Sequence, residues 1–131
     1  MQIKGIVIAL TCAIGALSTG VVAAADAMAS APLPALCQIT AAVKHYPADA
    51  DKAKLKEIIA DASVSAQNKT IAQVLLGMQH HVSDADQPKL KQIMEDASAN
   101  PAMKDLATII ATMNHMPSEG DKAKLSTLCG K

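Results

Sequence analysis

Apolar residues recur at helical spacing through most of the chain. One set comprises Leu55, Ile58, Ile59 and Ala62, followed later by Leu90, Ile93, Met94 and Ala97. A second set comprises Ile71, Val74, Leu75 and Met78, followed by Leu106, Ile109, Ile110 and Met113. Intervals of three, four and seven residues place side chains on one face of an α-helix. The pattern predicts amphipathic helices and an all-α fold.

The sequence repeats itself at an interval of 35 residues. "HYPADADKAKLKEIIADAS" (45–63) and "HHVSDADQPKLKQIMEDAS" (80–98) are identical at 11 of 19 positions without a gap. A shorter copy begins at His115, and a partial copy of the second helix includes Ile39 and Val43. Self-similarity at this period is typical of helical-hairpin repeats. The chain is therefore expected to begin and end with half a hairpin.

Polar residues mark the expected starts of these helices. Ser83 and Ser118 each stand three residues before an aspartate, a spacing that resembles a capping box. Asp49 is the expected cap in the first copy. Ser65 and Asn100 are expected to cap the second helix of each pair, because their side chains can accept a hydrogen bond from a free backbone N–H group.

The N-terminal segment has the features of an export signal. Lys4 precedes an apolar run from Gly5 to about Ala25, and Ala25-Asp26-Ala27 fits the small-residue rule for signal cleavage. We expect residues 1–27 to be a signal peptide and residues 28–131 to form one helical domain, without a stable membrane anchor after cleavage. The predicted location is the periplasm or the outside of the cell.

Two cysteines remain after the expected cleavage, Cys37 and Cys129. An even number of cysteines in an exported chain indicates a disulfide. In an open row of hairpins the two would lie too far apart, because a disulfide needs Cα atoms within about 7 Å. Their pairing predicts a compact, closed six-helix array with pseudo-threefold symmetry. An open array with cysteines paired between molecules is the alternative.

Composition limits the possible functions. The chain has 12 lysines and arginines against 12 acidic residues, and Tyr46 is its only aromatic residue among Phe, Trp and Tyr. A neutral balance argues against a nucleic-acid partner, because phosphate binding requires a basic surface. No phosphate-binding loop, nucleophile elbow or zinc-protease motif is present. We therefore name no catalytic residue and expect a non-enzymatic protein.

The histidines of the repeat have two interpretations. In a closed array His45, His80 and His115 could meet at a common axis, where three imidazoles would suit zinc or copper. The neighbouring candidate ligands are Met78, His81, Met113 and Met116. In the second interpretation, the helical spacing places position 80 outside the buried face, at the end of the helix. A histidine there can interact with the last carbonyl groups of its helix. The second interpretation is the preferred one.

The leading functional hypothesis is an exported helical repeat module that binds an unidentified protein or other macromolecule without a cofactor, since repeat arrays offer extended surfaces. The first alternative is a periplasmic metal-binding protein, for copper before zinc, that uses the Met and His side chains at these helix ends, where the methionines would suit Cu⁺. A carrier for a small apolar ligand is the second alternative, and it rests on composition alone.

Overall fold

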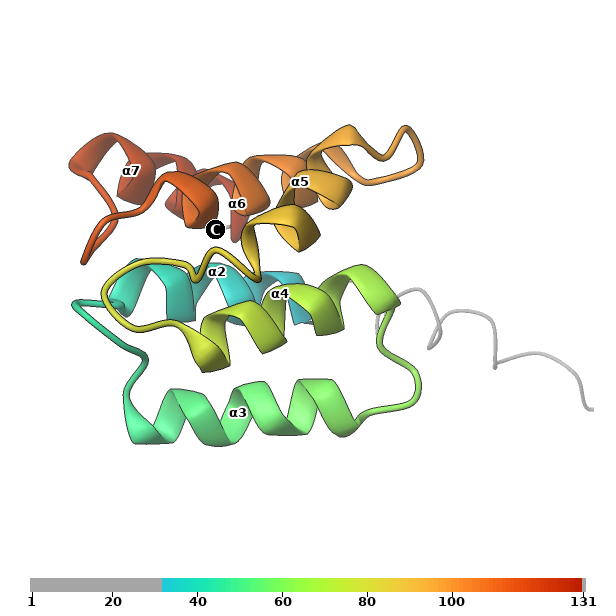
Figure 1. The fold of residues 1–131 in the computed structure, drawn as a ribbon, viewed down its shortest axis with the longest axis horizontal. Coiled ribbons are helices and arrows are strands. Elements are labelled where there is room, and N and C mark those ends of the chain that lie inside the picture. Colours follow the sequence, from blue (N-terminus) through green and yellow to red (C-terminus); the bar gives the residue numbers. More distant parts are fainter. Residues whose placement is uncertain (1–31, 131) are drawn as a thin grey trace, which may run out of the picture.

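Six α-helices make up the part of the chain that the computed structural model describes, residues 32–130. They are α2 (Pro32–Ala42), α3 (Asp49–Ala60), α4 (Ala66–Gly77), α5 (Gln87–Glu95), α6 (Pro101–Thr112) and α7 (Glu119–Leu128), and they are drawn in Figure 1. No strand is assigned in this range, so the predicted all-α class is confirmed. The predicted signal peptide, residues 1–27, lies outside the described residues.

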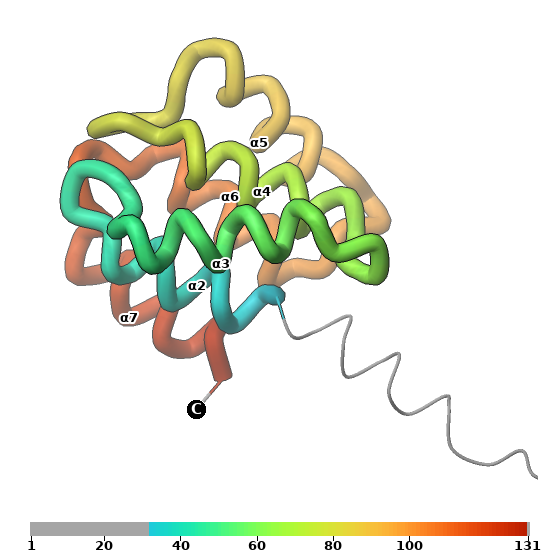
Figure 2. The backbone as a smooth tube through the Cα atoms, turned by 90° about the horizontal axis from the view of Figure 1, so that it is seen from below, coloured from blue at the N-terminus to red at the C-terminus, as the bar shows by residue number. Residues whose placement is uncertain are grey.

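The helices form an inner and an outer set. The inner helices α2, α4 and α6 contact one another, and each contributes five buried residues. The outer helices α3, α5 and α7 pack mainly against α4, α6 and α2 respectively. The last of these contacts brings the two ends of the described chain together, and Figure 2 shows α2 and α7 side by side.

The core contains most of the apolar positions that the spacing predicts, while Ile58, Ile59 and Met94 are only partly buried against it. Ile71, Val74 and Leu75 of α4 are fully buried, as are their counterparts Leu106 and Ile110 of α6. Ala62 and Ala97 are exposed, contrary to prediction, because α3 and α5 end before these positions. The expected fourth residue of each outer stripe therefore lies in a turn and not on the helix.

Three of the five predicted caps are present. Ser65 accepts a hydrogen bond from the Asn68 N–H group, Asn100 accepts one from Ala102, and Ser118 forms a capping box with Asp121. The other two predictions are wrong. The N-cap of α3 is Ala48, which has no side-chain bond, and α5 begins only at Gln87, after a turn that occupies the expected first residues.

Cys37 and Cys129 are both free thiols, so the structure does not contain the predicted disulfide. Cys37 is buried in α2, and Cys129 follows the last residue of α7. Burial, followed by interaction with the neighbouring Cys129 thiol, raises the pKa of Cys37 to about 12. The packing of α7 on α2 thus places the two cysteines near each other, and their oxidation remains a prediction.

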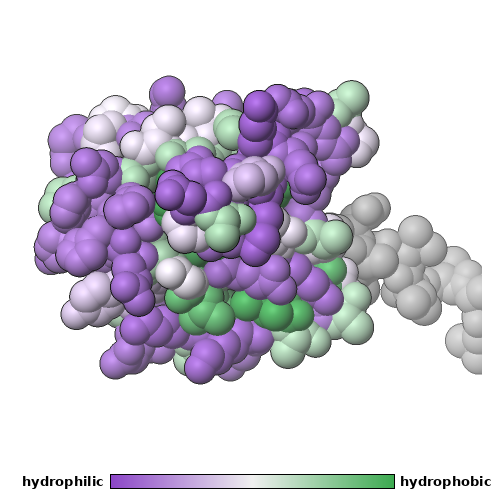
Figure 3. Space-filling view, in the orientation of Figure 1, coloured by the Kyte–Doolittle hydropathy of each residue, from purple (hydrophilic) through white to green (hydrophobic). Residues whose placement is uncertain are grey.

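The face of the molecule shown in Figure 3 is mainly hydrophilic, with a small apolar area in its lower half. None of the helices between residues 32 and 130 is both long enough and apolar enough to span a membrane.

Candidate functional site

Three connections, which we call the histidine loops, follow the inner helices directly. They comprise residues 43–47 after α2, 78–82 after α4 and 113–117 after α6. The first and last residue of each loop is buried, and the three residues between them are exposed. Because both ends are fixed in the core, the middle residue of each loop is held at the surface. These middle residues are His45, His80 and His115.

All three loops lie at the same end of the molecule, at the left in Figures 1 and 2. Their backbones are joined in sequence around that end. The His80 N–H group donates to the His45 carbonyl oxygen at 2.7 Å, and the His115 N–H group donates to the His80 carbonyl oxygen at 2.6 Å. The backbone therefore sets the spacing of the three histidines before their side chains are considered.

His80 and His115 adopt an unusual backbone conformation. Their φ angles are 62° and 67°, and they are the only residues other than glycine with positive φ in the described chain. This left-handed region costs about 1–3 kcal/mol for a residue with a side chain and persists only where the surroundings enforce it. The buried loop ends and the hydrogen bonds between loops supply that constraint.

The three imidazole rings converge. Their centroids are 5.2 Å apart for His45 and His80, 5.3 Å for His45 and His115, and 5.1 Å for His80 and His115. Each ring offers one nitrogen atom such that all three nitrogen atoms lie within 4.8 Å of one another, and all three residues are exposed. Three neutral nitrogen donors in this arrangement can act together on one bound ion.

The preferred interpretation of these histidines as helix-end residues is wrong in its geometry. α4 ends at Gly77, and the N–H group of its C-cap Met78 already donates to Leu75. His80 therefore lies beyond the cap and faces the other two histidines. Helical spacing could not give its direction, because the helix does not continue to that position.

The His115 ring has a hydrogen-bond partner in the preceding residue. Its Nδ1 atom lies 2.6 Å from the Asn114 side-chain oxygen. An amide oxygen only accepts hydrogen bonds, so with this assignment Nδ1 carries the proton and Nε2 presents its lone pair. Sequence reasoning missed Asn114, although its position immediately before a repeat histidine was visible.

The other proposed ligands occupy different surroundings. Met78 and Met113 are buried members of the core, as expected from their place on the apolar stripe. His81 is exposed but lies outside the three-histidine group. Met116 is 48% exposed. The structure thus brings together the three imidazoles, while two of the thioether side chains fill the interior.

The charged residues near the loops are paired at the surface. Lys52 lies 3.3 Å from Asp49 and 5.2 Å from the centroid of the Tyr46 ring. Hydrogen bonds from Lys89 and then Ser83 lower the pKa of Asp86, which stays an anion at neutral pH. No carboxylate or thiol of residues 32–130 joins the three-histidine group.

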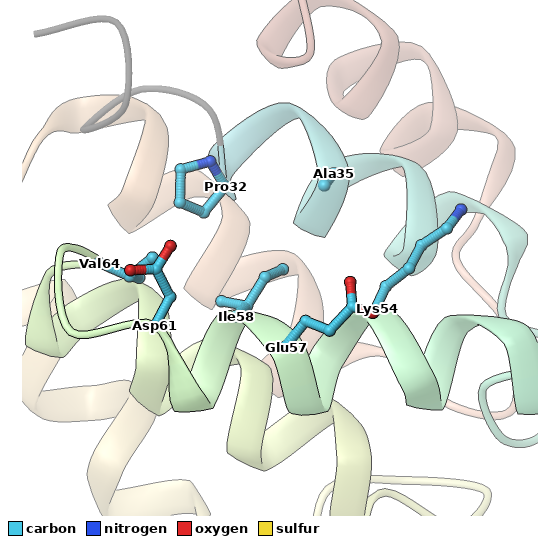
Figure 4. Close-up of a pocket in the computed structure, with 7 residues that line it drawn as sticks. All are labelled: Pro32, Ala35, Lys54, Glu57, Ile58, Asp61 and Val64. Atoms are coloured by element: carbon cyan, nitrogen blue, oxygen red, sulfur yellow. The ribbon is translucent and has the colours of Figure 1, made fainter. Parts of the chain in front are cut away.

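A separate cavity of about 380 Å³ lies between α2 and α3 (Figure 4). Its apolar lining includes Ile58 and Val64, and its charged residues are Lys54, Glu57 and Asp61. It contains no histidine or cysteine, and its side chains do not form a set of converging donors of one kind. The three-histidine cluster is therefore the stronger candidate site.

Comparisons with protein-family models, curated proteins and solved structures give no match for this chain. The fold and the site define it as an all-α protein that carries a surface cluster of three histidines.

Proposed function

We propose that the protein binds a divalent transition-metal ion, zinc or copper, through His45, His80 and His115. The observation that carries the proposal is the convergence of three exposed imidazoles from three separate loops. Imidazole nitrogen is a preferred donor for both metals. This convergence favours metal binding over a general protein-interaction role, because no comparably organised surface on residues 32–130 indicates a partner.

The spacing of the nitrogen atoms is compatible with one shared ion. Zinc–nitrogen bonds of about 2.0–2.1 Å in a tetrahedral arrangement place the donor atoms about 3.3 Å apart. The nitrogen atoms now lie within 4.8 Å of one another. Metal binding therefore requires the nitrogen atoms to move closer together by about 1.5 Å at most. Rotation of the exposed side chains can provide this movement without moving the buried loop ends.

The site would leave part of the coordination sphere open. Three protein ligands with a fourth position for water or a small ligand are typical of zinc sites that exchange ligands, whereas structural zinc sites have four. Since Met78 and Met113 are in the core, the arrangement supports imidazole coordination of a divalent ion more strongly than thioether coordination of Cu⁺.

Calorimetric titration of tag-free protein with Zn²⁺ and with Cu²⁺ tests the proposal. We expect one ion per chain with submicromolar affinity. His45→Gln, His80→Gln and His115→Gln should each weaken binding by more than about 100-fold, because second-shell changes alone cost 10- to 100-fold. Lowering the pH through the range in which histidines are protonated should release the ion, since only neutral imidazole coordinates.

His81→Gln is the matched control, because His81 neighbours the cluster without belonging to it. This variant should retain the affinity of the unmodified protein. Equal loss in the His81 variant, or full retention in the His80 variant, would show that the bound ion is held elsewhere. Absence of submicromolar binding would reject the proposed function.

The sequence and the structure together support a proposal on the overall architecture and the location of the protein. The interval of 35 residues and the contact between α2 and α7 support a closed array of three helical hairpins with pseudo-threefold symmetry. The segment of residues 1–27 supports export, so we propose that the protein acts in the periplasm or outside the cell.

A further inference from the structure

A cavity of about 460 Å³ opens beside the three-histidine cluster. It is lined by His80, by Tyr46 and Lys52, and by residues 76–79 at the end of α4. One candidate ligand of the metal therefore forms part of the wall of a cavity large enough for a small molecule. A ligand that enters this cavity can reach both the histidine and the lysine.

The cavity presents a positive group next to an aromatic ring. The Lys52 ammonium lies 5.2 Å from the Tyr46 ring centroid, and it is 3.3 Å from the Asp49 carboxylate. Asp49 is 99% exposed, so water screens its attraction for Lys52 and leaves the ammonium available to a second anion. Leu76 adds an apolar side chain to the lining.

This combination occurs once among the three copies of the repeat. The residues that correspond to Tyr46 and Lys52 are His81 and Gln87 in the next copy, and Met116 and Lys122 in the last. The three histidines recur at every interval, whereas the pairing of an aromatic ring with a lysine belongs to the first copy. The residues beside the three histidines therefore differ chemically from one copy of the repeat to the next.

We propose that the metal ion held by the three histidines takes a small carboxylate anion as its fourth ligand, seated in this cavity and paired with Lys52. The proposal rests on the proposed metal site. Three neutral imidazoles leave the two positive charges of the ion uncompensated, which favours an anion in the open position. Lys52 is the one ammonium in the lining of this cavity, which matches a monoanion, whereas a phosphate would require more cationic hydrogen-bond donors.

Cobalt(II) provides the test, because its visible absorption changes when the fourth ligand of a tetrahedral site changes. The cobalt-loaded protein is titrated with sodium acetate, and with acetamide as the neutral molecule of the same shape. Acetate should change the spectrum saturably and acetamide should not. Lys52→Gln, which introduces the residue found at position 87, should weaken acetate binding about two- to fivefold, the range for an exposed ion pair.

Lys122→Gln is the matched control, because Lys122 holds the corresponding position away from the Tyr46 cavity. It should bind acetate as the unmodified protein does. Equal acetate affinity in the Lys52 variant, or an equal response to acetamide, overturns the carboxylate subsite while leaving the metal site intact. Failure of cobalt, zinc and copper to bind at all rejects the proposed function and this inference together.

Discussion

Replacing Asn68 with methionine should stabilise the fold. Asn68 lies in the first turn of α4 and is 4% exposed. Its side-chain oxygen is buried without a hydrogen-bond partner. The residues 35 positions before and after it are Leu33 and Met103, and Met103 is buried in α6. The amide therefore stands where the other two copies of the repeat place an apolar side chain.

The expected gain in the free energy of unfolding comes from removing that unpaired oxygen. A buried acceptor without a partner costs about 1–3 kcal/mol, and a methionine side chain can adapt to the space it leaves. The cap from Ser65 should survive, because it binds the backbone N–H group of residue 68. A gain of 1 kcal/mol raises Tm by about 4–8 °C in a domain of up to about 100 residues.

Thermal and urea unfolding followed by far-ultraviolet circular dichroism measure the effect, since the chain has no tryptophan to serve as a probe. Asn68→Ala removes the amide without filling the space that it leaves. This variant therefore separates the effect of removing the unpaired oxygen from the effect of packing a methionine side chain there. Met103→Asn is the reverse control and should cost at least about 2 kcal/mol, the lower value for removing a buried methionine side chain. Destabilisation by both Asn68→Met and Asn68→Ala would refute the reasoning, because it would show that the amide makes a favourable interaction.

Three further predictions concern the cysteines, a surface carboxylate and export. Under oxidising conditions Cys37 and Cys129 should form one intramolecular bond, and Cys129→Ser should lower the free energy of unfolding by up to about 4–5 kcal/mol. That difference should vanish after reduction, and two free thiols or a linked dimer in oxidised protein would contradict it. Asp86→Asn should cost about 0.5–1 kcal/mol at neutral pH. Because the folded-state pKa of Asp86 is lowered, its contribution is present above the ordinary aspartate range and is lost as the pH falls through the lowered value; a difference that grows in acid would refute this. Mass spectrometry of exported protein should find an N-terminus near Met28, a residue outside the described structure, whereas a retained full-length chain would contradict the signal peptide.

The apolar spacing was sufficient to predict the class and most of the core. Leu75 and Ile110 are buried because they occupy inner faces of regular helices, where periodicity determines direction. Helix ends were harder to predict. Asp86 is the N-cap of α5, although its spacing from Ser83 resembles that of a residue in the first turn. Ser83 instead donates to the Asp86 side chain across the preceding turn.

The site shows why the sequence interval was more informative than the helical stripe. Extending the α4 stripe past Gly77 assigns His80 to a helix face that does not exist, because the chain leaves the helix there. The direction of His80 depends on a positive φ angle and on a hydrogen bond to His45, a residue 35 positions away. Neither feature has a signature in the local sequence.

Metal binding would act on the fold through the same long-range contacts. The three histidines are brought together only when α2, α4 and α6 pack against one another, so the unfolded chain does not present the preformed site. An ion that binds only the native state stabilises it by about 2.7 kcal/mol at a free concentration 100 times Kd. Part of the cost of holding His80 and His115 at positive φ would then be offset by the ion that they coordinate. The loops that hold these histidines are joined to the core at both ends, so the stabilisation would extend to all three inner helices and not only to the surface loops.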